Sequence, residues 1–194
     1  MHTTRRVIAG LFGLAAASLA FASLAATSLT ATVQTQITAH YRGTNDLGSP
    51  TFDLNPASQT ALRFENGTGA NQMNALFADT RTIAASSSEN LDLAGSLVDP
   101  LGATLTFVTV KTIKVCAAAA NTNNVVVGGA GSNTFAGVFA DATDKVNVKP
   151  GGCFLWVAPG TGATVTASTG DILLVANSGS GTGVTYDVII MGTQ

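Results

Sequence analysis

Apolar and polar residues alternate over short runs along most of this chain, which is typical of β-strands that bury one face. The alternating and the continuous apolar runs predict strands, in chain order, at 61–65, 80–84, 89–93, 103–117, 125–127, 146–148, 153–157, 163–167, 171–176 and 184–190. Turn-forming residues separate these runs, and helix-like spacing is limited to one short turn at 71–79. The pattern therefore predicts an all-β fold, an antiparallel β-sandwich that is jelly-roll-like.

The longest predicted strand, 103–117, changes its apolar face near its middle. Its apolar residues keep to odd positions towards both ends, but Val108 and Val110 occupy even positions between them. A change of phase of this kind predicts a β-bulge or a bend near Thr109.

Residues 1–28 have the layout of a bacterial export signal. Two arginines precede the uncharged apolar stretch 7–21, and small residues then offer cleavage sites after Ala22 or Ala25. Because about 20 apolar residues are needed to cross a bilayer, we expect cleavage and no stable membrane span. The alternative is a gene start at Leu29, since leucine codons can initiate bacterial translation, and 1–28 would then be an upstream extension.

Weak periodicity and many turn formers set residues 29–56 apart from the rest of the chain. We predict an N-terminal arm over 29–56 and a β-sandwich domain over 57–194. The arm is a candidate for a segment that orders on a neighbouring molecule, and a disordered terminus is the alternative.

Charged residues are scarce, and the basic ones are scattered. Asp, Glu, Lys and Arg make up 10% of the chain, whereas hydrophobic residues make up 46%. Of the nine basic residues, two lie in the N-terminal segment, so seven remain against eleven acidic ones. Nucleic-acid binding depends on clustered Lys and Arg, and we therefore expect no nucleic-acid partner.

Few residues offer catalytic or ligand-binding chemistry. His40 is the only histidine after the N-terminal segment, and its place in the arm predicts exposure rather than a catalytic triad. Asp141 and Asp144 are two carboxylates without further acidic partners, which predicts a solvated turn rather than a calcium site. Trp156 lies in an apolar strand, where core packing is favoured over a sugar platform. We expect no catalytic residue, no metal, no cofactor and no enzymatic activity.

The two cysteines, Cys116 and Cys153, lie at the ends of apolar strands, and we expect both to be buried. Their spacing matches no metal motif. In an exported protein they could form one disulfide, whereas in the cytoplasm they would remain small core residues.

Several loop and strand segments carry a family resemblance: 79–97, 102–107, 146–152 and 183–190. Together they resemble small structural proteins encoded in the virion gene clusters of tailed phages and prophages. The resemblance covers about 62–192 and implies a capsid decoration or cement-like subunit, often a jelly roll. Such a subunit works as a homo-oligomer on the major capsid protein or other virion subunits.

Three functions are compatible with these patterns. The first is a virion structural protein, assembled in the cytoplasm, with its start near Leu29. The second is an exported surface or adhesive β-sandwich protein, secreted or periplasmic, with a cleaved signal peptide. The third is an exported carbohydrate-binding or hydrolytic module, which would need paired carboxylates and Trp156 in one groove.

Overall fold

The computed structural model describes residues 28–44, 46–54 and 60–194, and these residues form strands and loops without a helix. The all-β prediction is therefore confirmed. The predicted signal or upstream extension lies outside the described residues except for Ser28. In the described part of the chain, no helix has the length and hydrophobicity to cross a membrane.

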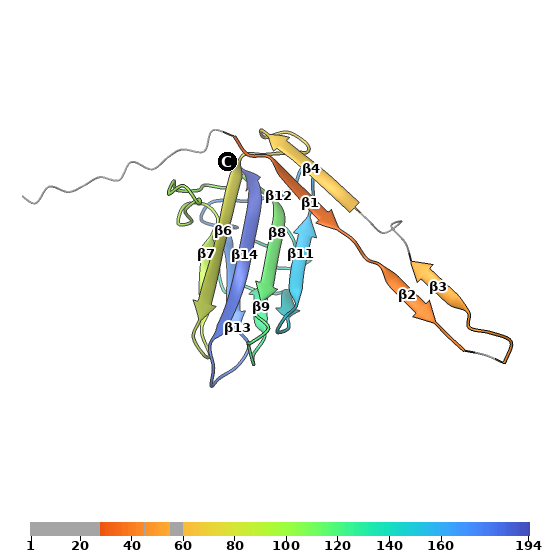
Figure 1. The fold of residues 1–194 in the computed structure, drawn as a ribbon. Coiled ribbons are helices and arrows are strands. Elements are labelled where there is room, and N and C mark those ends of the chain that lie inside the picture. The colour runs from red at the N-terminus through yellow and green to blue at the C-terminus, as the bar shows by residue number, and fades with distance from the viewer. Residues whose placement is uncertain (1–27, 45, 55–59) are drawn as a thin grey trace, which may run out of the picture.

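Two antiparallel sheets face each other and form the body of the molecule (Figure 1). The front sheet has the order β11 (Cys153–Val157), β8 (Thr109–Ala117), β14 (Val184–Thr193) and β6 (Ala75–Ile83), and β12 (Ala163–Thr164) also pairs with β8. The back sheet has the order β10 (Lys145–Val148), β9 (Val125–Gly128), β13 (Ile172–Asn177) and β7 (Ser88–Asp92). The predicted antiparallel β-sandwich is confirmed.

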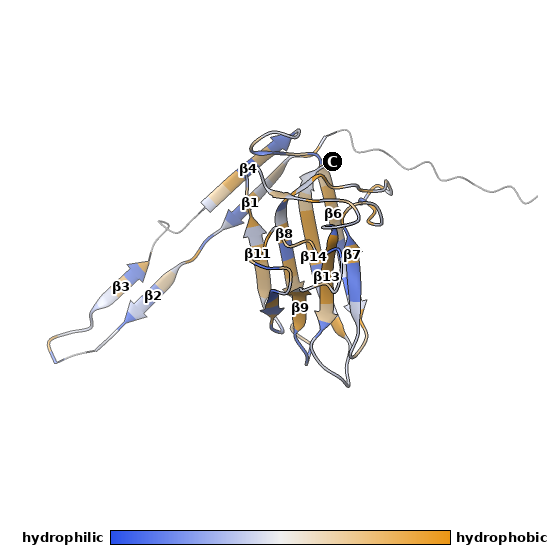
Figure 2. Ribbon diagram, turned by 180° about the vertical axis from the view of Figure 1, so that it is seen from behind, coloured by the Kyte–Doolittle hydropathy of each residue, from blue (hydrophilic) through white to orange (hydrophobic). Residues whose placement is uncertain are grey.

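The core lies between the two sheets, where alternate residues of each strand point inwards. Figure 2 shows apolar residues concentrated on the central strands of both sheets. The largest fully buried side chains of this core include Leu91, Phe107, Ile113, Leu173, Tyr186 and Ile190. Burial of these side chains supplies the main driving force for folding.

In the body, early strands of the chain pair with late ones, and the two middle strands pair with each other. The earliest strand, β6, pairs with the last, β14, and β7 pairs with β13. In the same way β8 pairs with β11, and β9 pairs with its successor β10. The front and back sheets therefore each combine strands from the early and the late parts of the body.

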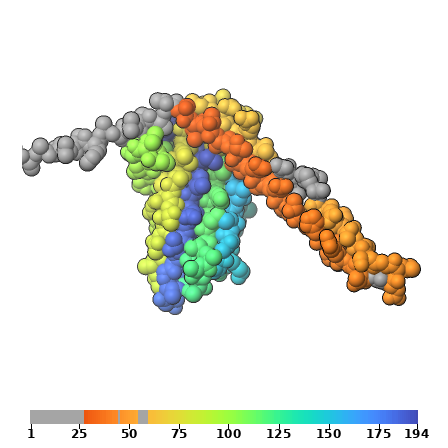
Figure 3. All heavy atoms as spheres, viewed as in Figure 1, coloured from red at the N-terminus to blue at the C-terminus, as the bar shows by residue number. Residues whose placement is uncertain are grey.

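The N-terminal strands form a long two-stranded ribbon that leaves the body (Figures 1 and 3). We call the described residues 31–44, 46–54 and 60–66 the ribbon. Its base consists of β1 (Ala31–Thr35) paired with β4 (Thr60–Asn66). Its tip, residues 37–44 and 46–54, contains β2 (Ala39–Arg42) paired with β3 (Thr51–Leu54). The short β5 (Gln72–Met73) pairs with β4 and leads into the body.

The short helical turn predicted at 71–79 is wrong, because β5 and most of β6 occupy this range. Ala75 and Phe77 point into the core, while Leu76 packs on the opposite side under the ribbon base. Burial on both sides of β6 produces apolar spacing that resembles a helix.

The predicted strand 103–117 is shorter in the structure, where β8 begins at Thr109. A register shift follows at once, since Met191 pairs with Thr112 but Gly192 pairs with Val110. Lys111 is therefore the extra residue of a β-bulge, and the predicted irregularity near Thr109 is confirmed.

Candidate functional site

The ribbon base is held on the body by its own apolar cluster, separate from the main core. Phe64 and Met73 are completely buried, and Met191 of β14 packs with them from the outer side of the front sheet. Residues packed around these three are Leu29, Ala31, Val33, Leu62, Leu76, Val157 and Ile189. The base is thus a firmly packed third layer on the outer side of the front sheet.

The ribbon tip has one apolar side and one polar side. Tyr41 pairs with Phe52 across the two strands, and their side chains are 75% and 61% exposed. The next pair, His40 and Asp53, lies on the opposite side, where the His40 Nδ1 and an Asp53 carboxylate oxygen are 2.6 Å apart. The tip therefore presents two neighbouring aromatic side chains to solvent, and contiguous exposed apolar surface of this kind is typical of interaction sites.

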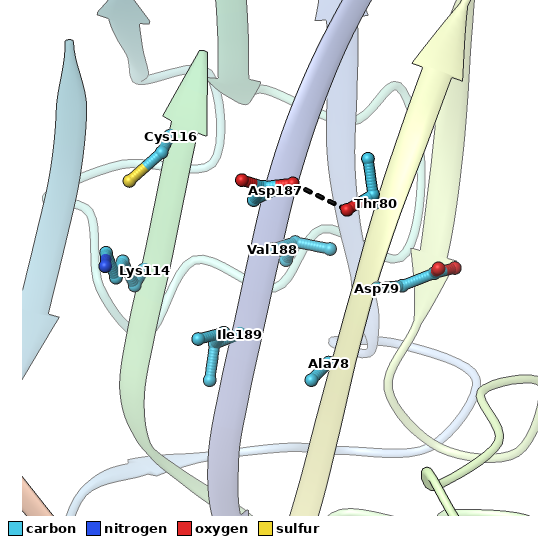
Figure 4. Close-up of a pocket in the computed structure, with 8 residues that line it drawn as sticks. All are labelled: Ala78, Asp79, Thr80, Lys114, Cys116, Asp187, Val188 and Ile189. Carbon is cyan, nitrogen blue, oxygen red and sulfur yellow. Dashed lines mark hydrogen bonds between the residues drawn. The ribbon is translucent and has the colours of Figure 1, made fainter. Parts of the chain in front are cut away.

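The outer side of the front sheet is only partly covered by the ribbon base. The part left open, which we call the acceptor face, consists of Ala78, Thr80, Lys114, Leu155 and Asp187, with Ile189 at its border. Most of these residues line a shallow hollow of about 420 Å³ across β6, β14 and β8 (Figure 4). The Thr80 hydroxyl donates a 2.6 Å hydrogen bond to Asp187 in this hollow. The acceptor face therefore combines apolar surface with one cation and one anion.

A buried lysine fixes the bulge of β8 to the turn between β4 and β5. Lys111 is 1% exposed, and its Nζ donates hydrogen bonds to the carbonyl oxygens of Gly69 at 2.5 Å and Gln72 at 2.9 Å. Burial lowers the pKa of Lys111, since the charged form has lost its water. This arrangement ties the ribbon's return strand to the front sheet.

A polar network closes the edge of the sandwich between β6 and β7. Tyr186 is 1% exposed, and its hydroxyl donates a 2.9 Å hydrogen bond to Glu89, which also accepts one of 2.6 Å from Arg81. Asp79 is a second partner of Arg81, at 2.9 Å. Burial and the Glu89 charge raise the pKa of Tyr186, and the hydrogen bond to Glu89 raises the pKa of Arg81. Tyr186 therefore stays protonated and acts as a structural donor between the two sheets.

The residues that the sequence offered as candidates do not come together. His40 is exposed on the ribbon tip, as predicted. Asp141 and Asp144 lie in an exposed turn, where Asp144 accepts a 2.9 Å hydrogen bond from the Asp141 amide. Two hydrogen bonds from Thr143 lower the pKa of Asp141. Among the described residues, no group of three or more His, Cys, Asp or Glu side chains is placed to hold a metal ion.

Trp156 is half-buried and packs against the main core together with Phe154. Its side chain lies on the inner side of β11, and core packing is confirmed over an exposed sugar platform.

The predicted burial of both cysteines is wrong. Cys116 and Cys153 are directly opposite each other on β8 and β11 and form a disulfide on the outer side of the front sheet. Cys153 is exposed and Cys116 is half-buried. Both cysteines occupy outward positions of their strands, which the apolar neighbours Val115 and Phe154 concealed in the sequence.

Sequence reasoning missed the most prominent surface feature, the aromatic pair of the ribbon tip. A signal was present, because Ala39 and Tyr41 alternate with His40 and Arg42, and Phe52 and Leu54 alternate with Thr51 and Asp53 in the same way. These residues form two short alternating strands of opposite direction.

Comparison of the chain with protein-family models, with curated proteins and with solved structures gives no match.

Proposed function

We propose that this protein is a non-enzymatic assembly subunit, and specifically a capsid decoration or stabilisation subunit of a tailed phage or prophage. In this proposal the ribbon tip binds a neighbouring virion subunit and the sandwich supplies a rigid body. The observation that carries it is the ribbon itself, a firmly anchored hairpin that holds Tyr41 and Phe52 in solvent. Aromatic side chains of this kind are the usual anchors of protein interfaces.

The strand order supports a jelly roll. Pairing of β6 with β14, β7 with β13, β8 with β11 and β9 with β10 is what results when an antiparallel ribbon of four strand pairs is wound into two sheets. This arrangement agrees with the fold implied by the resemblance to virion structural proteins.

The test is association with particles from an induced culture of the source strain. We expect the wild-type chain to purify with the particles and to begin near Leu29. The variant Phe52→Asp should lose most of this association, because a carboxylate replaces an anchor on the apolar side of the tip. Thr51→Asp is the matched control, since the neighbouring residue lies on the polar side and gains the same charge. Equal association of the two variants would argue against the proposal.

The Cys116–Cys153 disulfide favours the second candidate, an exported surface or adhesive protein. Disulfides persist in oxidising compartments and are rare in the cytoplasm. In that case the mature chain would be found outside particles, cut after Ala22 or Ala25, with both thiols blocked to alkylation before reduction. A chain inside particles with two free thiols would exclude it.

A further inference from the structure

We propose that the ribbon tip of one molecule docks on the acceptor face of a second copy of this chain. The inference rests on the proposed function, because it names the partner of the ribbon. It follows from four features of the described residues: a half-covered sheet face, a ribbon whose base and tip each have one apolar side, the direction of the ribbon, and the chemistry of the hollow.

The acceptor face continues an interface that already exists within the molecule. Under the ribbon base, β6, β14 and β11 contribute Leu76, Met191 and Val157. Ala78 of β6 and Leu155 of β11 lie on the same side of the sheet, two residues further from the ribbon base, and both are exposed. The acceptor face is therefore the open half of a surface whose other half is built to receive a β-ribbon.

The apolar side of the ribbon keeps the same residue parity from base to tip. In β1 the odd-numbered Ala31 and Val33 pack towards the front sheet, and in β2 the apolar residues are again odd-numbered, Ala39 and Tyr41. The return strands behave alike: the even-numbered Leu62 and Phe64 of β4 pack on the sheet, and the apolar residues of β3, Phe52 and Leu54, are also even-numbered. The apolar residues of the tip thus follow the same odd–even pattern as the residues of the base that pack on the front sheet.

The ribbon tip lies away from the acceptor face of its own molecule. Figures 1 and 3 show the ribbon crossing the top of the front sheet, passing the edge strand β11 and ending well clear of the body. A second molecule placed beyond β11 would bring its own acceptor face under the tip. The contact would join two different surfaces, so that repetition produces a ring or an open chain.

The hollow suits an aromatic side chain. Ala78 and Ile189 supply apolar walls, and Lys114 supplies an ammonium group (Figure 4). A cation over the face of an aromatic ring adds an attraction of about 0.5–1 kcal/mol at an exposed site. Tyr41 or Phe52 of a second copy therefore finds both apolar contact and a positive charge there.

The test is a complementation experiment with the full chain, read by native mass spectrometry and light scattering. We expect the wild-type chain to form oligomers. Phe52→Asp removes a working tip and Ala78→Arg fills the hollow with a charged side chain, so each variant alone should be monomeric. Mixed in equal amounts, they should form a one-to-one heterodimer, because one intact tip and one intact acceptor face remain. Thr51→Asp is the control for Phe52→Asp. Leu101→Arg, which places an arginine at an exposed position outside the front sheet, is the control for Ala78→Arg. Both control variants should oligomerise as wild type does.

Other outcomes would overturn the inference. Wild-type association by an Ala78→Arg chain that melts normally would mean that the ribbon tips bind each other or another surface. If Ala78→Arg does not fold, Leu155→Arg on β11 provides the same test from the other edge of the acceptor face. A wild-type chain that stays monomeric, yet binds particles through Phe52, would show that the tip binds a different virion protein. The proposed function would then survive while this inference fails. Oligomers that never associate with particles would instead support this inference and argue against the proposed function.

Discussion

At the scale of single residues, Thr112 carries a polar group in a place that gives it no partner. Its side chain is 2% exposed beneath the ribbon base, opposite Met191 and Val157, and its Oγ1 makes no hydrogen bond within the described residues. Because an unpaired buried hydroxyl destabilises the folded state, Thr112→Val should raise the free energy of unfolding by about 1 kcal/mol. Denaturation in urea measures this change.

Thr109 provides the matched control for this substitution. Its hydroxyl is bonded to that of Thr193 at 2.7 Å, so Thr109→Val removes a hydrogen bond that the protein uses. We expect this variant to lose about 1 kcal/mol. A loss of stability in both variants would mean that the Thr112 hydroxyl has a partner after all.

Lys111 should make stability depend on pH. Burial places its folded-state pKa below the ordinary value of 10.5, so between these two values the unfolded chain binds more protons than the folded one. Rising pH therefore favours the folded state, and wild type should gain stability relative to Lys111→Met as the pH approaches 10.5. Urea denaturation of both proteins over a pH series tests this, because Tyr186 and the other groups are common to both. Parallel curves would contradict it.

At the scale of elements, the bulge of β8 depends on a glycine in the partner strand. A Cβ atom on Gly192 would lie 1.9 Å from the carbonyl oxygen of Thr109, inside the front sheet. Relief would require β8 and β14 to separate, and Gly192→Ala should therefore lower the free energy of unfolding by about 3 kcal/mol or more.

Gly131 is the matched control, because a Cβ there would meet no atom within 4 Å and its φ is not in the left-handed region. Gly131→Ala should leave the melting temperature nearly unchanged. If the two variants melted alike, the close approach of β8 and β14 at Gly192 would be wrong.

Some elements of the fold could be predicted from the sequence, and others could not. Alternation identified most body strands, because each has one face in the core and one outside. The bulge at Lys111 was visible as a change of phase, but the burial of its side chain was not. That burial depends on the turn at 67–72, whose carbonyl oxygens accept hydrogen bonds from Lys111. The turn lies over Lys111 because the ribbon base packs on the front sheet.

The ribbon was the least predictable element. Its base strands β1 and β4 pair across an intervening segment of 24 residues, 36–59, and no local turn signal specifies that register. The tip strands carry the alternating pattern described above, but each has only four residues, so the signal is weak beside the many turn formers around it. The acceptor face was equally hidden, since it needs the order of β6, β14, β8 and β11, which only the tertiary structure establishes.

At the scale of the whole molecule, the ribbon base should contribute strongly to the stability of the folded state and the ribbon tip very little. No described residue of 36–59 belongs to either apolar cluster, whereas Phe64 of the base is 1% exposed. Thr35 and Thr60 already face each other at the end of the base pair, so an Asn-Gly turn can join them in place of 36–59. This shortened chain should keep the wild-type melting temperature within a few degrees.

Phe64→Ala should instead cost about 3–5 kcal/mol, because it empties the cluster that fixes the base to the front sheet. Oligomerisation, in contrast to stability, should depend on the ribbon tip. The shortened chain should be a stable monomer that still accepts a ribbon from a wild-type molecule, since its acceptor face is intact. A shortened chain that unfolds would show that the tip packs on its own body, and the division of the molecule into a rigid body and a reaching ribbon would be wrong.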